Sequence, residues 1–582
     1  MESKALKESW VRRVKEHPQK TFIISHFDFL GRKNADNLYK VCWYEADQII
    51  RNFVKGLSVL GFKPFDSLAI FSENRPRWIF SCLGAMLSRG VFVPIYPTSK
   101  KIDVEWILSN SSAKFVVCGS MQHAEIVIEL KSTLVNLNKI ILMEPITEKH
   151  EDIIGFDELI EIGQKSGISD LEIDEKIDEI QEEDLATIIY TSGTTGKPKG
   201  VELTYKNFLA QTPLEKDFDF SENELFFAHL PLCHSFGLSI DLLLAVNIGA
   251  TLFVADSLET NYIRKNLKLC RPTFMASVPR LWEKIYITIK ERVNSQNFIK
   301  KFIIKVLKYA AKGMVMNLVK SQVGLDRLKY SATGGGPIDP KLIEYFGELG
   351  ITLYQGYGLT ETAPIIAANT PKFNKTGTVG KPLPNVELKI AKDGELLVKA
   401  PQIMRGYHKN PGATSEVIDK EGWFSTGDIA EIDKDGFVKI TDRKKELIIT
   451  SAGKNIAPQP IENEFNTDPY IEIACVIGDR RNFISAIIVP EFDNVRNWLK
   501  NNTSEWIEDN EKLINHPKVV ELFNERVAIA NKNLAKYEQI KKFSVVSNPF
   551  SVENGELTPS LKKKRRVIHE KYKDIINSMY NN

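Results

Sequence analysis

Short apolar runs alternate with amphipathic segments through the first two thirds of the chain, and this alternation restricts the fold more than any other feature of the sequence. The segment Tyr44–Leu60 carries its apolar residues on one helical face and ends at Gly61, and Trp78–Ser88 is a second helical stretch. Strand-like apolar runs lie around and after these segments: Leu68–Phe71, Val91–Tyr96, Phe115–Cys118, Ile140–Met143, Ala186–Tyr190, Thr251–Ala255, Thr273–Ala276 and Tyr330–Thr333. Strands that alternate with helices predict parallel sheets that are covered by helices on both faces.

The chain is too long for one compact core. Its 582 residues suggest several units, at roughly 100–200 residues per domain. After Thr378 the pattern changes, because Asp393-Gly394 and Asp435-Gly436 each lie between short apolar runs, which is a strong hairpin signal. The expected fold class is α/β: a large N-terminal domain of two layered α/β subdomains plus a small β-rich subdomain, followed by an α+β C-terminal domain.

Two segments between these parts differ from their surroundings. Glu172–Asp184 is strongly acidic, and such a run is typical of a solvated connector. Glu283–Lys320 is rich in lysine and carries an apolar stripe, which predicts helical structure.

Composition and charge exclude several classes of protein. Hydrophobic residues make up 43% of the chain and charged residues 26%, which excludes a largely disordered protein. Lys and Arg total 77 against 75 Asp and Glu, so the net charge of +2 gives no electrostatic reason to expect a nucleic-acid partner. The 6 cysteines are scattered without the spacing of a metal or redox site, so we expect reduced thiols.

The sequence favours a cytoplasmic protein. The N-terminal segment Met1–Lys20 lacks the apolar core of a signal peptide. The most apolar window, Leu230–Ala255, contains His234, Asp241 and Asn247, so we interpret it as buried core and not as a membrane span. Peripheral contact between the basic, Trp-containing N-terminus and a membrane stays open, and no obligate protein partner is implied.

The segment Thr191–Gly200, TSGTTGKPKG, is the strongest chemical signal in the sequence. It follows a buried strand-like run, and its glycines allow a tight turn whose backbone N–H groups can point at phosphate oxygens. Its hydroxyls add donors and its lysines add positive charge. It is not a Walker A loop, because Gly193 and Gly196 are too close together and Pro198 follows Lys197. We therefore interpret it as a different kind of phosphate-binding loop.

The chain resembles the adenylate-forming superfamily, which includes acyl-CoA synthetases, firefly luciferase and the adenylation domains of peptide synthetases. TSGTTGKPKG is similar to the phosphate-loop signature of this superfamily. Other strings are similar to its further signatures in order and spacing: YQGYGLTET at Tyr354–Thr362, STGD at Ser425–Asp428, DRKKE at Asp442–Glu446 and TPSLKKKRR at Thr558–Arg566. The resemblance covers nearly the whole chain, from about Tyr44 to Arg566. It implies an N-terminal AMP-binding domain of residues 1–444 and a mobile C-terminal domain of residues 445–582 that carries the catalytic lysine.

The resemblance also implies a nucleotide site. Adenylation joins a carboxylate to the α-phosphate of ATP and releases pyrophosphate, so the site must supply cations and fixed hydrogen-bond donors. Thr191 and Glu361 would hold Mg²⁺ and take part in catalysis, and Asp428 and Arg443 would bind the ribose. The residues implied for binding ATP or AMP are Thr191, Ser192, Gly193, Thr194, Thr195, Gly196, Lys199, Gly334, Gly335, Gly336, Tyr357, Gly358, Thr360, Asp428, Arg443 and Lys562.

The catalytic lysine that the resemblance implies is Lys562. Two arginines follow it at the spacing of the family, although Leu561 replaces the usual glycine before it. Lysine suits the role as a mobile point charge that can bridge the carboxylate and the α-phosphate. Lys563 or Lys564 stays conceivable as the catalytic group. Without the resemblance, the run Lys562–Arg566 could also be a nucleic-acid patch or a nuclear-localisation signal.

The remaining site residues follow from the same resemblance. His234 and Phe236 would line the acyl pocket, with core packing as the alternative for His234. His234 is not expected to act as a general base, because a fatty acid is already ionised at neutral pH. Lys445 would be the hinge between the domains, and Gly453 and Lys454 would lie near the coenzyme A channel.

The function that the resemblance implies is an AMP-forming fatty acid–CoA ligase. The acid is first activated as acyl-adenylate, and the thiol of coenzyme A then displaces AMP. LIITSAGKNIAPQPIE, at residues 447–462, is most similar to bacterial-type long-chain acyl-CoA synthetases. An acyl–acyl-carrier-protein synthetase stays open, because PLCHSFGL at residues 231–238 also resembles that enzyme type. An inactive relative that binds nucleotide or lipid is the second alternative, and the sequence does not fix the acyl chain length.

Overall fold

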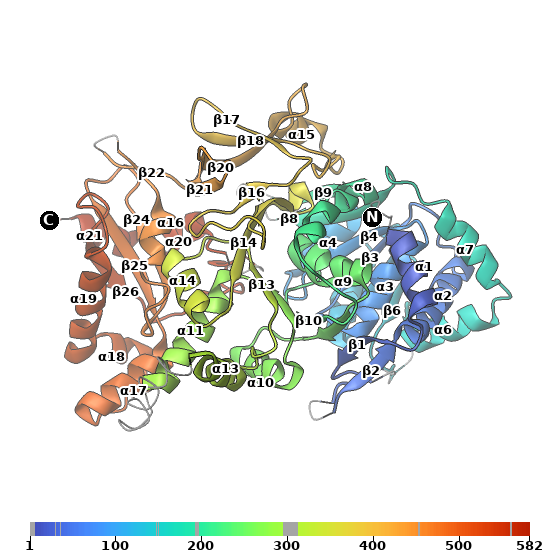
Figure 1. Ribbon diagram of the computed structural model, residues 1–582, viewed down its shortest axis with the longest axis horizontal. Coiled ribbons are helices and arrows are strands. Elements are labelled where there is room, and N and C mark those ends of the chain that lie inside the picture. The colour runs from blue at the N-terminus through green and yellow to red at the C-terminus, as the bar shows by residue number, and fades with distance from the viewer. Residues whose placement is uncertain are drawn as a thin grey trace.

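The computed structural model gives the architecture of most of the chain. Figure 1 shows the N-terminal elements in blue to yellow, a small sheet above them, and the orange and red C-terminal elements beside α11 and α14 (Pro279–Asn294 and Pro340–Glu348). The structure describes residues 6–28, 31–34, 37–146, 148, 150–191, 197–294, 312–451, 454–558 and 562–581.

Two large sheets form the N-terminal part. The first sheet contains, in spatial order, β19 (Gly406–Tyr407), β9 (Lys199–Thr204), β8 (Leu185–Thr191), β4 (Val91–Ile95), β3 (Ser67–Phe71), β5 (Phe115–Cys118), β6 (Lys139–Leu142) and β7 (Ile153–Gly155). Strands β3, β4 and β5 are parallel and buried along their whole length. Such continuous burial is typical of a parallel sheet that is covered on both faces.

The second sheet contains the strands that border the candidate site. In spatial order they are β16 (Lys381–Pro382), β15 (Ile365–Ala368), β14 (Leu353–Gly358), β13 (Tyr330–Thr333), β12 (Phe274–Ser277), β10 (Leu225–Ala228), β11 (Thr251–Val254), β1 (Thr21–Ser25) and β2 (Tyr39–Cys42). Strands β10 to β14 run parallel to one another, so their carboxyl ends meet at one edge of the sheet, whereas β15 is antiparallel to β14.

Helices fill the space between the sheets and cover their outer faces. The central core joins Trp78, Phe92 and Phe226, which come from a helix and from both sheets. Trp282 belongs to a separate core on the outer face of the second sheet. The helices of this part are α1 (Leu6–Glu16), α2 (Trp43–Val59), α3 (Pro76–Leu87), α4 (Lys101–Asn110), α5 (Met121–Leu130), α6 (Phe156–Lys165), α7 (Asp170–Asp178), α8 (Tyr205–Leu209), α9 (Leu244–Ile248), α10 (Thr260–Cys270), α11, α13 (Lys312–Val323) and α14, with shorter turns η1 (Thr212–Asp217), η2 (Gly237–Leu243) and η3 (Thr360–Thr362).

A small antiparallel sheet follows, and the last part of the chain has its own core. The small sheet contains β17 (Glu387–Ile390), β18 (Glu395–Lys399), β20 (Phe424–Ile432) and β21 (Val438–Arg443), with α15 (Pro411–Val417) before β20. A separate core holds buried side chains from Ile448 to Met579. Its elements are β22 (Ile448–Ile449), β23 (Asn455–Ile456), α16 (Pro458–Asn463), β24 (Ile471–Ile477), β25 (Ile484–Pro490), α17 (Phe492–Thr503), α18 (Asn510–Ile514), α19 (Pro517–Asn531), β26 (Ile540–Val545), α20 (Arg565–Lys571) and α21 (Lys573–Tyr580).

The expected α/β fold class is confirmed, whereas one local expectation was wrong. The acidic segment Glu172–Asp184 is not only a connector, because its first residues belong to helix α7. Ile173 and Ile177, one helical turn apart, are buried, and this apolar pair outweighs the acidic composition. The middle of Glu283–Lys320 lies outside the described residues, and its two ends form α11 and α13. The domain boundary at residues 444 and 445 stays a prediction.

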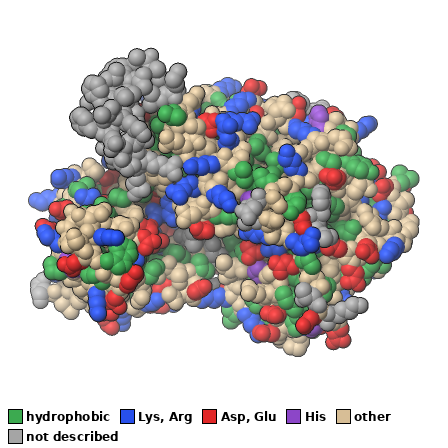
Figure 2. Space-filling view, turned by 90° about the horizontal axis from the view of Figure 1, so that it is seen from below, with side chains coloured by type: hydrophobic (Ala, Val, Ile, Leu, Met, Phe, Trp, Pro, Cys, Tyr) green, Lys and Arg blue, Asp and Glu red, His purple; other side chains and the backbone are tan. Residues whose placement is uncertain are grey.

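The surface in Figure 2 carries basic and acidic side chains mixed together, in line with the small net charge. No helix in the described ranges is both long enough and apolar enough to cross a membrane. Cytoplasmic location stays a prediction.

Candidate active site

A cavity of about 2950 Å³ lies where the second sheet meets the small sheet and the C-terminal elements. It collects the predicted site residues Thr191, Lys199, His234, Phe236, Gly334, Gly335, Gly336, Tyr357, Gly358, Thr360, Glu361, Asp428, Arg443, Lys445 and Lys562. Ser192, Gly193, Thr194, Thr195, Gly196 and Gly453 lie outside the described residues. The structure does not bring Lys454 to this cavity; its ammonium lies 4.2 Å from the centre of the Tyr537 ring.

Asp428 is a buried carboxylate in the wall of this cavity. It is only 4% exposed, and its position in β20 pairs with Arg443 in the neighbouring strand β21. Tyr357 Oη donates a hydrogen bond to Asp428 Oδ2 at 2.5 Å, and Arg443 Nε lies 3.3 Å from Asp428 Oδ1. Burial raises the pKa of Asp428, while Arg443 opposes this shift. A carboxylate has about four acceptor positions, so Asp428 keeps capacity for hydroxyl groups of a ligand.

Near Tyr357 the wall of the cavity is formed by glycine residues, which have no side chains. Gly334–Gly336 follow β13, and a Cβ atom on Gly334 would lie 3.3 Å from the Gly356 carbonyl oxygen and 3.4 Å from the Phe236 ring. At Gly358 a Cβ atom would lie 1.6 Å from the Pro364 carbonyl oxygen, so only glycine fits. These glycines leave room for a flat group to lie against the backbone beside the Tyr357 ring.

Glu361 and Thr191 place side-chain oxygen atoms at another wall of the cavity. Tyr407 Oη donates to Glu361 Oε1 at 2.9 Å, and the Met404 backbone N–H donates to the Glu361 carbonyl at 2.8 Å. Burial and the Glu361 carboxylate together raise the pKa of Tyr407, which therefore stays a protonated donor. A carboxylate held by one tyrosine and a hydroxyl from Thr191 form the kind of hard donor set that Mg²⁺ prefers beside phosphates. The residues present therefore fit a magnesium ion.

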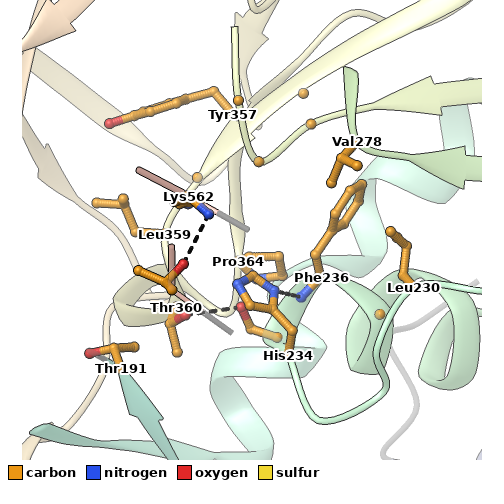
Figure 3. Close-up of a pocket in the computed structure, with 18 of the residues that line it drawn as sticks. Thr191, Leu230, His234, Phe236, Val278, Tyr357, Leu359, Thr360, Pro364 and Lys562 are labelled. Atoms are coloured by element: carbon orange, nitrogen blue, oxygen red, sulfur yellow. Dashed lines mark hydrogen bonds between the residues drawn. The ribbon is translucent and has the colours of Figure 1, made fainter. Parts of the chain in front are cut away.

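Lys562 lines the cavity from the C-terminal part, at the start of the segment Lys562–Arg565, which we call the lysine loop. Thr558 N donates to the Lys562 carbonyl at 2.8 Å, and Lys562 N donates to Thr558 Oγ1 at 3.0 Å. Figure 3 shows Lys562 among residues of the N-terminal part, including Tyr357 and Thr360. Burial lowers the pKa of Lys562, as does Arg443, whereas Asp428 and Glu361 raise it. The ammonium therefore lies within electrostatic range of both carboxylates.

The neighbouring lysine has a structural partner. Lys563 Nζ donates to the buried Glu462 carboxylate and, at 2.9 Å, to the Ala474 carbonyl. Arg565 Nη2 donates to Glu462 Oε2 at 2.8 Å, and Arg565 Nε lies 3.2 Å from Glu446 Oε2. Lys563 is thus paired inside the C-terminal part, whereas the charge of Lys562 interacts with the carboxylates of Asp428 and Glu361.

His234 and Phe236 border the apolar side of the cavity. The Phe236 backbone N–H donates to His234 Nδ1 at 3.2 Å, so the proton of the neutral ring lies on Nε2 (Figure 3). Burial, together with the nearby Lys562 charge, lowers the pKa of His234 to about 4. His234 is therefore neutral at pH 7 and offers one N–H donor.

Several residues of the site were not identified from the sequence. Tyr407 holds Glu361, Glu462 anchors the lysine loop, and the buried His229 lines the cavity with Nε2 3.0 Å from Ser277 Oγ. His229 has a local signal, because it lies in the same polar-interrupted apolar run as His234. Tyr407 and Glu462 have none, since their partners lie far away in the sequence.

Comparisons with known proteins show the family to which this chain is similar. Residues 10–408 match the family described as AMP-binding enzyme, and residues 445–582 match the AMP-binding enzyme C-terminal domain. The chain is 32% identical to the long-chain-fatty-acid–CoA ligase FadD15 of Mycobacterium bovis over 565 residues, which cover 92% of each protein. It is 30% identical to the long-chain-fatty-acid–CoA ligase ACSBG1 of Rattus norvegicus over 604 residues, 95% of this chain and 83% of that protein.

Solved structures support the fold. The anthranilate CoA ligase AuaEII in complex with anthranoyl-AMP superposes with a TM-score of 0.77 at 16% identity, covering 99% of this chain and 100% of that one. The o-succinylbenzoate CoA synthetase MenE of Bacillus subtilis gives a TM-score of 0.69 at 22% identity, covering 96% and 97%. The first family match includes the predicted site residues from Thr191 to Glu361, the second includes Lys562, and Asp428 and Arg443 lie between the two matched ranges. Because these matches cover most of the chain, the chain belongs to the AMP-binding enzyme family.

Proposed function

We propose that this protein is an ATP-dependent, AMP-forming fatty acid–CoA ligase that acts on long-chain acids. The observation that carries the proposal is the meeting of three features in one cavity: the Lys562 ammonium, the buried Asp428 carboxylate and an apolar region beyond His234. The relatives named as long-chain-fatty-acid–CoA ligases match more than nine tenths of the chain. The first step would form acyl-adenylate and release pyrophosphate.

The nucleoside of ATP would bind at the small sheet. Asp428 would accept hydrogen bonds from the ribose hydroxyls, with Arg443 beside it and Tyr357 fixing its orientation. The adenine ring would lie against the backbone of Gly334–Gly336. This placement leaves the phosphates directed toward Thr191 and Glu361, at the end of β8 and in η3.

Lys562 would bridge the two reactants of the first step. Negative charge builds up on the α-phosphate as the carboxylate attacks, and a fixed cation stabilises this charge most strongly in the transition state. Magnesium, held by Thr191 and Glu361, would neutralise the phosphate charge when it is bound. Neutral His234 would donate a hydrogen bond from its Nε2–H group to the fatty-acid carboxylate and so orient it, without acting as a base.

The second step would require the C-terminal part to rotate about Lys445. In the present arrangement Lys562 occupies the cavity, while Lys454, the predicted coenzyme A contact, lies away from it. Lys445 is exposed in the turn between β21 and β22. A rotation at this turn would withdraw Lys562 from the cavity and bring the residues of the coenzyme A channel to it.

An assay of AMP release across saturated fatty acids of increasing length tests the proposal. Each acid is supplied with ATP and magnesium and with coenzyme A, with an acyl carrier protein, or with no acceptor. We expect rapid AMP release only with coenzyme A, and greatest efficiency for long chains. Release that depends on the carrier protein would show the alternative ligase, and no turnover of any acid would contradict the proposal.

A further inference from the structure

The cavity extends away from the nucleotide site along one face of the helix that η2 and α9 form together. Gly237, Ile240, Leu244 and Asn247 line it, and their spacing of three or four residues places them on one helical face. This face begins beside Phe236 and ends at Asn247. At a rise of about 1.5 Å per residue, or slightly less in the π-helical turns, it is about 12–15 Å long.

The walls of this extension are largely apolar. Leu214, Phe218 and Phe220 line the same cavity as Ile240 and Leu244, and the Phe218 and Phe220 rings are stacked with centres 5.2 Å apart. Apolar walls of this kind suit the methylene chain of a fatty acid, because contact removes apolar surface from water.

The far end of the extension is polar. Asn247 Nδ2 donates to both carboxyl oxygens of Glu215, at 2.7 and 2.6 Å. Ser9 Oγ from α1 donates to Asn247 Oδ1 at 2.7 Å, and Arg13 Nη2 donates to the Asn247 carbonyl at 2.7 Å. Glu215, Asn247 and Ser9 all line the cavity. A carboxyl–amide pair therefore lines the cavity at the Asn247 end of this helical face.

The Glu215 carboxyl group retains hydrogen-bonding capacity beyond its two bonds from Asn247. The Asn247 side chain has partners on both its oxygen and its nitrogen. The Glu215 carboxyl group offers about four acceptor positions, and Asn247 occupies two of them. A methyl group packed against the remaining positions would leave them without a partner in a buried environment, which is unfavourable.

We propose that Glu215 and Asn247 form a polar subsite that binds a hydroxyl group at the distal end of the acyl chain, so that the enzyme prefers ω-hydroxy fatty acids of matching length to the corresponding unsubstituted acids. This inference deepens the proposed function and rests on it. It assigns to Glu215 a specificity role at the end of the chain opposite to the reacting carboxylate.

A hydroxyl group suits Glu215 in either protonation state. Burial raises the pKa of Glu215 to about 7, although Asn247 and Arg13 oppose this shift. A hydroxyl donates to the ionised carboxylate and accepts from the protonated acid. An ammonium group could pair only with the ionised form, so the hydroxyl is the better match near neutral pH.

Matched pairs of acids test the subsite. We would measure kcat/KM for saturated acids from lauric to stearic and for their ω-hydroxy derivatives, with the wild type and with Glu215→Leu and Glu215→Gln. The control is Asp219→Asn, because Asp219 belongs to the same segment but its side chain is 97% exposed. Isothermal titration calorimetry then measures, without ATP, how tightly the enzyme binds the two acids of the pair with the largest difference in kcat/KM. Because this measurement does not depend on turnover, it distinguishes a failure of the subsite from a failure of the ligase function.

We expect the wild type to favour one ω-hydroxy acid over its unsubstituted partner, and Glu215→Leu to reduce this ratio of kcat/KM by at least about tenfold. Glu215→Gln should keep most of the preference, because its amide still pairs with a hydroxyl, and Asp219→Asn should keep all of it. Equal wild-type use and binding of both members of every pair would overturn the inference. An unchanged ratio in correctly folded Glu215→Leu would also overturn it.

Discussion

Arg565 donates a hydrogen bond to the fully buried carboxylate of Glu462 at 2.8 Å, and the same carboxylate oxygen accepts from Lys563. The other oxygen accepts from the Val476 backbone N–H at 2.8 Å. These bonds tie both ends of the segment after Lys562 to α16 and β24. They hold the loop in the orientation that presents Lys562 to the cavity.

Loss of this buried charge should destabilise the C-terminal part. Glu462→Gln removes the carboxylate that pairs with Lys563 and leaves Arg565 with Glu446 alone, and breaking a buried ion pair from one side costs about 3–5 kcal/mol. We expect a loss of this size in the free energy of unfolding, measured by urea denaturation. Glu570→Gln is the control, because its pair with Arg566 is exposed and should contribute little. Equal stability of the two variants would contradict the account.

Glu462 should also make the stability depend on pH. Burial raises the pKa of this carboxyl, but Arg565 and Lys563 outweigh burial, so the folded-state pKa lies below its ordinary value of about 4.3. The contribution of Glu462 is then complete above about pH 4.3 and disappears as the pH falls through the lowered pKa. The stability difference between the wild type and Glu462→Gln should therefore shrink below pH 4. A difference that stays constant down to pH 3 would contradict this.

The sequence predicted the parts of the fold that depend on local patterns. The run Phe115–Cys118 became β5 without change, since an apolar run buried on both faces leaves a clear signal. The helix α7 was missed although Ser169 and Glu172 form a capping box and the isoleucines lie one turn apart. In this segment the burial of Ile173 and Ile177 determines the structure more strongly than the acidic composition does.

The site was predicted where motifs fix the residues and missed where only folding brings residues together. Tyr357, Asp428 and Arg443 lie in signature strings, and the structure places them in contact. Tyr407 contacts Glu361, and Glu462 contacts Arg565, only through packing of elements distant in the chain. The spacing of residues in a single sequence gives no indication of contacts between such distant residues. The assignments of catalytic, hinge and coenzyme A residues stay predictions.

Glu361→Gln should lower turnover and weaken the dependence on magnesium, because an amide oxygen is a poorer ligand than a carboxylate. We expect the magnesium concentration for half-maximal AMP release to rise about tenfold or more. Tyr407→Phe is the matched control: it removes the hydrogen bond to Glu361 but keeps the carboxylate, so the magnesium dependence should change much less. An unchanged magnesium titration in Glu361→Gln would show that Glu361 has only a structural role.

Lys445→Pro should separate the two half-reactions. Proline fixes φ near −65° and would restrict the rotation that brings coenzyme A to the site, while the arrangement with Lys562 in the cavity already exists. We expect acyl-adenylate to form at a near-normal rate and acyl transfer to coenzyme A to slow at least about tenfold in single-turnover experiments. Lys445→Ala, which keeps the backbone free, should transfer normally. If both half-reactions slow together, or neither slows, the hinge does not lie here.

The most direct test of the central claim is fatty-acid-dependent exchange of pyrophosphate into ATP without coenzyme A, because this reaction isolates the first step. Lys562→Ala should reduce the exchange by about 10²–10³-fold while ATP still binds, since the lost cation acts mainly in the transition state. Lys564→Ala should stay within about tenfold of the wild type. Exchange by Lys562→Ala within tenfold of the wild type would contradict the assignment of Lys562 and, with it, the proposed geometry of the first step.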